Sequence, residues 1–272
     1  MKVDFWGVRG TVPVSGKDII KYGGHTMCAS LSISEREVIV VDAGTGIKRL
    51  GDRLIKETGK GRLNIHLFLT HFHLDHIIGI PFFAPLYSAN AVLTVYAPSS
   101  PQEGQDYLKK IMSGRFFPVD FEEAPSKKFF KKMPEDELKI SEVLISACPL
   151  LHPQGSVAYR LQEGERSIVM ATDTEHPEFG VDQRLASFVN QADILVYDAM
   201  FTPEEYKSGR KGWGHSTWLA GTEIARAAGV GSLYLSHFNP DHSDKNIDEF
   251  ISLAKNKFPH TFGAREGKSV IF

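Results

Sequence analysis

Short apolar or alternating runs and longer segments with helical spacing succeed one another along most of the chain. Short runs bounded by Gly, Pro or polar turns are typical of β-strands, whereas apolar residues three or four apart are typical of helices that face a core. We predict strands at residues 2–8, 28–33, 38–41, 65–69, 92–96, 143–148, 156–161, 167–171, 194–197, 232–235 and 269–272. We predict helices at residues 47–57, 105–112, 183–190, 217–228 and 245–256, with an apolar helix or turn at 77–83.

The interleaving of these elements indicates a layered α/β architecture with sheets inside and helices outside. No internal repeat or low-complexity linker divides the chain, so we expect a single domain over residues 1–272. Residues 98–142 are the hardest to place, and they contain the charged run 127–132. That run could follow a phosphate backbone, but a solvated face with Phe129 and Phe130 turned inward is the better interpretation.

The composition is that of an ordinary soluble protein, with 42% hydrophobic and 24% charged residues and a net charge of -2. This balance disfavours the binding of long nucleic acid by charge alone. Cys28 and Cys148 are the only cysteines, and we expect two buried thiols rather than a disulfide framework. The first ten residues include Asp4 and Arg9 and so lack a signal-peptide core, and no apolar stretch is long enough to span a membrane. We therefore expect a cytoplasmic protein.

The motif His71-x-His73-x-Asp75-His76 follows a predicted buried strand. Imidazole and carboxylate groups are the ligands that suit zinc, iron or manganese. His71 and His73 are two residues apart, so in an extended loop their side chains project to the same side. Four potential ligands within six residues are far more than a chance surface histidine would explain, and the motif predicts a metal site.

Three further residues of the same kind follow later strands of the prediction. They are His152, Asp173 and His237, and each comes just after a short apolar run. Because strand ends collect at the edge of a sheet, we expect these loops to lie along one rim with the first motif.

The series from His71 to His237 resembles the five signature motifs of the metallo-β-lactamase superfamily in order and spacing, over essentially the whole chain. The resemblance implies a four-layer αββα sandwich with two metal ions at one edge. It implies that a first metal is held by His71, His73 and His152, and a second by Asp75, His76 and His237. Asp173 would bridge the two metals.

Asp42, in the segment 41–46, matches the motif near the start of the family's sequences. The resemblance implies that it orients metal ligands. The alternative, nearly as well supported by the sequence, is that it caps the following helix.

Several segments are similar to the phosphodiesterases of this superfamily. Residues 212–217 resemble the Gly-His-Ser segment of the tRNA 3′-processing nuclease and related phosphodiesterases, which implies that His215 meets the scissile phosphate. Residues 6–13, 22–26 and 198–201 are similar to bacterial cyclic-nucleotide and carbon–phosphorus-pathway phosphodiesterases of this superfamily, and most similar to the cyclic-nucleotide group. Residues 98–142 are neither glycine-rich nor convincingly basic, so they do not resemble the long Gly/Pro-rich tRNA-binding arm of the nucleases.

The resemblance therefore implies a phosphodiesterase that acts on small phosphodiesters such as cyclic nucleotides, through a hydroxide that bridges two divalent ions (Zn, or Mn or Fe). Asp75 and His215 are the candidate catalytic residues, and His215 is also the candidate substrate-binding residue. A thioester or lactone hydrolase and a non-catalytic sensor of a phosphate ligand are the alternatives. Relatives also imply a homodimer. His25 could reach the site or stabilise a turn, and His66, His176, His242 and His260 are interpreted as structural or surface residues.

Overall fold

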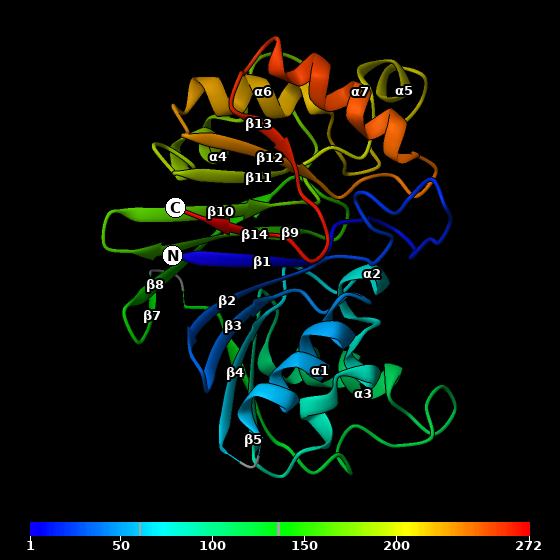
Figure 1. Cartoon of the computed structure of the whole chain (residues 1–272), viewed down its shortest axis with the longest axis vertical. Helices are drawn as coiled ribbons and strands as arrows, with labels where there is room; N and C mark the ends of the chain where they lie inside the picture. The colour runs from blue at the N-terminus through cyan, green and yellow to red at the C-terminus, as the bar shows by residue number, and fades with distance from the viewer. Residues whose placement is uncertain (60, 135–136) are drawn as a thin grey trace.

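Two β-sheets pack face to face in the computed structural model, and helices cover both outer faces (Figure 1). The structure describes residues 1–59, 61–134 and 137–272. This is the four-layer αββα sandwich that the resemblance implied, and the prediction of fold class is confirmed.

The first sheet has the strand order β14-β1-β2-β3-β4-β5-β6. Its pairs from β14 to β3 are antiparallel, and its pairs from β3 to β6 are parallel. Its strands are β1 (Lys2–Gly7), β2 (Cys28–Ser34), β3 (Glu37–Val41), β4 (Leu63–Phe68), β5 (Ala91–Ala97), β6 (Lys127–Lys132) and β14 (Ser269–Ile271).

The second sheet has the order β13-β12-β11-β10-β9-β8-β7 and repeats the same design. The pairs from β7 to β10 are antiparallel, and those from β10 to β13 are parallel. Its strands are β7 (Leu138–Ile140), β8 (Val143–Leu150), β9 (Ser156–Glu163), β10 (Arg166–Ala171), β11 (Ile194–Asp198), β12 (Ser232–Ser236) and β13 (Thr261–Gly263).

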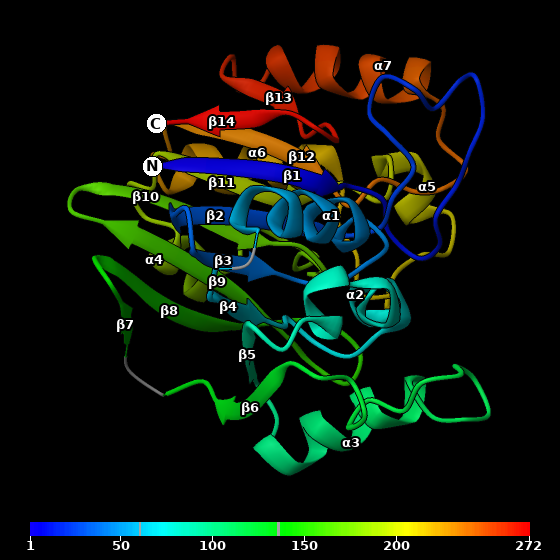
Figure 2. The same ribbon diagram turned by 60° about the horizontal axis from the view of Figure 1, so that its bottom comes forward.

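Helices α1 and α3 lie on the outer face of the first sheet, and α4, α6 and α7 lie on that of the second (Figures 1 and 2). The helices are α1 (Ile47–Thr58), α2 (Leu74–Ile77), α3 (Pro101–Ile111), α4 (Gln183–Phe188), α5 (Pro203–Lys207), α6 (Trp218–Ala227) and α7 (Asp244–Lys255), with 3-10 turns η1 (Ile80–Phe82) and η2 (Ala84–Tyr87).

Strand β3 shows how the sequence builds two cores from one sheet. Successive side chains of a strand point to opposite faces. Ile39 and Val41 join the core between the two sheets, while Val38 and Val40 join the core under α1 and α3. All four are buried, so this strand reads as a continuous apolar run, as expected for a central strand covered on both faces.

Each predicted strand overlaps an observed one, but β6, β7, β13 and α5 were missed. The run 127–132 presents Lys127, Lys131 and Lys132 to solvent, as expected of a solvated face, but the expectation that both phenylalanines turn inward was wrong. The run is the edge strand β6, in which Phe130 packs against the core and Phe129 is 51% exposed. Neighbouring residues on a strand cannot both face inward, which is why only one phenylalanine is covered.

Two helices begin earlier than predicted. Helix α3 starts at Pro101 because Ser100 and Glu103 form a capping box around its first turn. Helix α2 starts at Leu74, so Asp75 and His76 lie on a helical turn.

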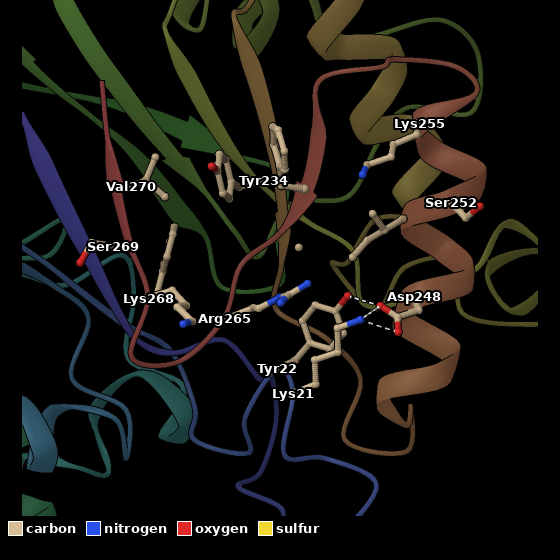
Figure 3. Close-up of a pocket in the computed structure, with 14 residues that line it drawn as sticks. Lys21, Tyr22, Tyr234, Asp248, Ser252, Lys255, Arg265, Lys268, Ser269 and Val270 are labelled. Carbon is tan, nitrogen blue, oxygen red and sulfur yellow. Dashed lines mark hydrogen bonds and ion pairs between the residues drawn. The ribbon is translucent and has the colours of Figure 1, made fainter.

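A cavity of about 490 Å³ lies where α7 meets β13 and β14 (Figure 3). Beside it, Asp248 of α7 receives hydrogen bonds from the Lys21 ammonium at 2.5 and 2.6 Å and from the Tyr22 hydroxyl at 2.6 Å. These contacts tie the segment between β1 and β2 to the last helix.

Both cysteines are buried and free, as predicted. None of the helices in the described part of the chain has the length and apolar character that crossing a membrane requires.

Candidate metal centre

Polar residues gather at the rim where the parallel strands end. Asp42 follows β3 directly and His237 follows β12 directly, while Asp198 is the last residue of β11. Asp173 comes shortly after β10, and His152 shortly after β8. Since the carboxyl ends of parallel strands meet at one edge, strand polarity alone brings these side chains together.

Three of these residues have a left-handed backbone. The φ angles are 61° at Asp42, 59° at Asp173 and 57° at His237. Non-glycine residues rarely adopt this region, although Asp and His do so more readily than most. Each sharp turn ends a strand and redirects the chain at a polar side chain, which is the kind of strain that clusters at functional sites.

A first group of donors consists of imidazoles alone. The ligand atoms of His71, His73 and His152 all lie within 4.8 Å of one another. Nε2 of His152 lies 3.1 Å from Nδ1 of His73. This spacing suits three ligands arranged around one cation.

A second group mixes imidazole with carboxylate. The ligand atoms of Asp75, His76, Asp173 and His237 also lie within 4.8 Å of one another. Nε2 of His76 lies 3.1 Å from Oδ2 of Asp173, and Nε2 of His237 lies 3.3 Å from the same oxygen.

Asp173 lies between the two groups. Its Oδ1 is 3.8 Å from Nε2 of His71 and 3.8 Å from Nε2 of His152, while its Oδ2 faces the second group. One carboxylate therefore presents one oxygen to each group.

Four of the five histidines have their remaining ring nitrogen in hydrogen-bond contact with a group outside the cluster. Nδ1 of His71 lies 3.1 Å from the Thr70 hydroxyl, and Nδ1 of His76 lies 2.8 Å from Oδ2 of Asp42. His73 Nε2 contacts Gln154 Oε1 at 3.1 Å and His152 Nδ1 contacts Gly214 O at 2.7 Å, whereas His237 Nδ1 lies 3.4 Å from Asp198 Oδ2 without a hydrogen bond. Such outer contacts fix the ring orientation and leave the inner nitrogen free to bind a metal.

Asp42 also accepts hydrogen bonds from the backbone and hydroxyl of Thr70. Helix α1 has Gly46 as its N-cap with no side-chain hydrogen bond, so the alternative that Asp42 caps this helix is wrong. Asp42 orients His76 instead.

The donor set fits a cation. Among the described residues, Nε2 of His71, Nε2 of His76 and Oδ2 of Asp173 are buried atoms without a hydrogen-bond partner. Unpaired polar atoms are costly to bury, and here they converge on the two groups. A metal ion would satisfy them.

The electrostatics favour ligands in their binding state. Burial, with the neighbouring His76, lowers the pKa of His71 to about 2, so this imidazole keeps its lone pair. Burial alone would raise the pKa of Asp173, but His237, His76 and His71 hold it well below its usual range. Burial would likewise lower the pKa of His76, and the carboxylates of Asp173 and Asp75 raise it instead. The negative field that holds a proton there would equally hold a cation.

His215 lies beside the second group, just before the N-terminus of α6. Its Nδ1 is 3.1 Å from Oδ2 of Asp198 and 3.9 Å from Oδ1 of Asp173. Burial would lower the pKa of His215, but Asp198 raises it to about 9. Asp198 therefore favours the protonated form of this ring, which is partly open to solvent and lies beside the cluster.

No role was predicted for Asp198 from the sequence alone. The structure places it with Asp173, His215 and His237 in a third group of potential ligands. It also accepts hydrogen bonds from the backbone N–H groups of Asp173, Met200 and Ser216. The signals in the sequence were its position at the end of a buried strand and its place in the segment 198–201 that resembles phosphodiesterases.

Glu175 is a second residue that sequence reasoning missed. Its carboxylate accepts hydrogen bonds from the N–H groups of Gly212 and Gly214 at 2.7 and 2.9 Å, and from the Tyr206 hydroxyl at 2.6 Å. Gly214 has φ +82, and a Cβ there would lie 2.4 Å from Nδ1 of His152. Only glycine fits, and Glu175 holds the loop that positions both His152 and His215.

The structure thus brings together all the residues predicted as ligands, with His215 beside them. His25 does not join them, because its Nδ1 contacts the Thr45 hydroxyl at 3.1 Å. His242 contacts Glu205 and His66 contacts Glu37, in agreement with the structural interpretation of both. His176 contacts the Ser216 hydroxyl, and His260 is exposed.

A cavity of about 510 Å³, here called the catalytic pocket, opens over the cluster. Asp75, Asp173 and His215 form its floor, and Arg210 and Trp213 form part of its wall. Arg9, fully buried, donates hydrogen bonds to the carbonyls of Gly23, Asn239 and His242, which fixes the loops around this rim.

Residues 37–238 match the family model described as the beta-lactamase superfamily domain. Ribonuclease Z of Haloarcula marismortui is 24% identical, in an alignment that covers 95% of this chain and 92% of that protein.

Two solved structures share the fold. The metallo-beta-lactamase fold protein YhfI of Bacillus subtilis aligns over 99% of both chains with a TM-score of 0.72 and 20% identity. A diphosphatase from the PhnP family aligns over 100% of this chain and 97% of its own, with a TM-score of 0.65 and 15% identity.

Proposed function

The chain belongs to the beta-lactamase superfamily and is a hydrolase of the metallo-β-lactamase fold, and we propose that it hydrolyses small phosphodiesters such as cyclic nucleotides. The observation that carries the proposal is the position of His215, whose Nδ1 lies 3.1 Å from Asp198 and 3.9 Å from Asp173, beside the two groups of metal donors. A cationic imidazole beside a dinuclear centre suits a substrate that carries a negative charge throughout its reaction.

In this proposal, His71, His73 and His152 hold one divalent ion, and Asp75, His76 and His237 hold another, with Asp173 shared. The donor set accepts zinc, manganese or iron. When bound, the two ions would polarise the phosphoryl oxygens and make a coordinated water more acidic. Asp75 also accepts a hydrogen bond from the backbone of Thr11 at 2.7 Å, which fixes the carboxylate at the floor of the pocket.

His215 is proposed to bind the phosphoryl group and to donate a proton. Its Nδ1 is engaged with Asp198, so Nε2 is the nitrogen available to the substrate. In the ground state it pairs with a phosphoryl oxygen, and it can protonate the ester oxygen that leaves. Asp198 keeps the ring oriented in both roles and favours its protonated form until the proton is donated.

The small-substrate assignment is supported by the absence of an arm for a long nucleic acid in the described residues. The segment after β5 folds back as α3 and β6, and β6 pairs with β5. The net charge of -2 gives no general attraction for a polyanion.

Cleavage of RNA is the second candidate, because the relative from Haloarcula marismortui is named ribonuclease Z.

The single domain over residues 1–272 and the homodimer also stay predictions.

A substrate panel with defined metal content tests the proposal. The purified protein is stripped, reloaded with Zn²⁺, Mn²⁺ or Fe²⁺, and assayed with cyclic nucleotides, bis-p-nitrophenyl phosphate, a thioester, a lactone and a tRNA precursor. We expect the wild type to turn over cyclic nucleotides, and we expect this turnover to be roughly 10²-fold slower in His215→Ala. Turnover of the thioester or lactone alone would replace the proposal with the other hydrolase class. Cleavage of the tRNA precursor alone would favour the RNA candidate, and tight nucleotide binding without turnover would favour a sensor.

A further inference from the structure

A second cavity of about 720 Å³, here called the side pocket, adjoins the catalytic pocket. His73 and Leu74 line both cavities, so these two residues form a shared wall. The remaining wall comes from α3, from the end of β5 and from the segment that joins β8 to β9. Its apolar members are Phe72, Leu74, Ile77, Pro98, Tyr107, Ile111, Pro149 and Val157.

The side pocket exposes apolar surface that the fold has not covered. Leu74 is 60% exposed and Tyr107 is 37% exposed, although both lie in a concave site. Phe72 meets the Tyr107 ring edge to face, with centroids 4.8 Å apart. Concave apolar sites with an aromatic wall and a few polar groups are where proteins bind small organic ligands.

The catalytic pocket differs in the residues around its aromatic side chains. Its Trp213 is 55% exposed, and a cation lies over this ring as over that of Tyr107: the Arg210 guanidinium is 4.5 Å from the Trp213 ring, and the Lys110 ammonium is 5.3 Å from the Tyr107 ring. Polar side chains and the metal donors make up most of the rest of that cavity. The catalytic pocket therefore suits the charged part of a substrate, and the side pocket suits an uncharged planar part.

The side pocket also has polar groups that could form hydrogen bonds with the edge of a bound aromatic ring. The Lys110 ammonium lies 5.3 Å from the Tyr107 ring, and Ser99 lines the same cavity. Gln154 lines it too, and its Oε1 contacts Nε2 of His73 at 3.1 Å. An occupant of the side pocket would thus touch a residue that orients a proposed metal ligand.

We infer that the side pocket binds the nucleobase of the substrate, with Tyr107 as the specificity-determining residue. The phosphodiester lies over the metal donors, and the base crosses the wall formed by His73 and Leu74 to pack against Tyr107. This inference rests on the proposed function, and it adds that an aromatic base, rather than the phosphate alone, decides which phosphodiesters are good substrates.

The test compares two substrates and two aromatic residues. The substrates are a purine cyclic nucleotide and the same cyclic phosphate on methyl riboside, which has no base. In Tyr107→Ala, kcat/KM for the nucleotide should fall about 5- to 150-fold, the value of one base–aromatic stack of roughly 1–3 kcal/mol. The loss should lie in KM, kcat/KM for the methyl riboside should stay within about twofold, and Tyr107→Phe should resemble the wild type.

Trp213→Ala is the matched control from the other cavity, and it should leave the ratio of the two kcat/KM values unchanged. A base-specific loss in Trp213→Ala, or an unchanged ratio in Tyr107→Ala, would overturn the inference.

Calorimetry with a purine nucleoside monophosphate and the metal-loaded protein gives a readout that does not require turnover. Its Kd should rise by the same factor in Tyr107→Ala. If the wild type binds this nucleotide through Tyr107 but hydrolyses neither substrate, the proposed function fails and the base site stands. If Tyr107→Ala leaves the Kd unchanged, the base site fails.

Discussion

The two halves of the metal centre are built from different donors and differ in their access to solvent. The first half, His71, His73 and His152, carries no carboxylate of its own, and His73 is exposed at the mouth. The second half, Asp75, His76 and His237, lies deeper, and His76 and His237 are fully buried. Asp173 serves both.

Because of this difference, we expect the two halves to bind their ions with different affinities and exchange rates. Negative donors and burial strengthen the attraction for a divalent cation, so the second half should bind its ion more tightly. The first half has neutral donors and an open side next to both cavities, so its ion should exchange faster and stay accessible to substrate. Each half can be perturbed separately, which makes the comparison testable.

The largest effect is expected from the residue that the halves share. Asp173→Ala removes one donor oxygen from each side, so both ions should bind weakly and kcat should fall by ~10⁴-fold or more. Metal content by mass spectrometry and kcat on the preferred phosphodiester measure this. Glu178→Ala, at an exposed ion pair with Lys211, is the control. Retention of both ions in Asp173→Ala would show that this carboxylate is not shared.

A smaller loss is expected from a residue that belongs to neither half. His215→Ala removes the cationic ring but no proposed ligand, so kcat should fall by roughly 10²-fold while both ions stay bound. Stopped-flow assays with parallel metal analysis separate the two effects. An unchanged kcat would remove His215 from the mechanism, and loss of an ion would make it a ligand.

The second half should depend strongly on its buried support. Asp42→Asn keeps the shape but removes the charge that faces His76 at 2.8 Å, so affinity for the tighter ion should fall by ~100-fold. Competition with a chelator of known affinity measures the change. If only the weaker ion were affected, the assignment of the two halves would be reversed.

The smallest effect is expected at the exposed support of the first half. Gln154→Ala removes the contact to His73, which lies at the solvent boundary, so affinity for the weaker ion should fall by ~10-fold or less. Gln183→Ala, on the exposed face of α4, is the control. A loss as large as that of Asp42→Asn would contradict the view that burial separates the halves.

The positions of the donors were readable in the sequence because each follows a strand whose apolar pattern is strong. Asp173 and His237 end buried runs, and strand polarity then carries them to one rim. The strands β7 and β13 have three residues each, a length that gives a weak pattern, and of the three-residue strands only β14 was predicted. In β6 the run of lysines hid an edge strand, since edge strands often carry charge to prevent pairing with other chains.

The supporting residues were not readable in the same way. Asp198 and Glu175 act through partners distant in the sequence, such as His215 and Gly214. A carboxylate at a strand end is equally compatible with a cap, a surface ion pair or a ligand. Only the arrangement of the chain in space distinguishes these roles, as it did for Asp42.

The pairing of β1 with both β2 and β14 has a consequence for how the chain acquires its structure. Val3 lies opposite Leu31 on one side and Val270 on the other. Pairing of β1 with β2 closes a short loop, whereas pairing with β14 joins residues far apart in the sequence, such as Val3 and Val270. Contacts between distant residues form more slowly, so one edge of β1 should stay open until late in folding, and β14 then closes it.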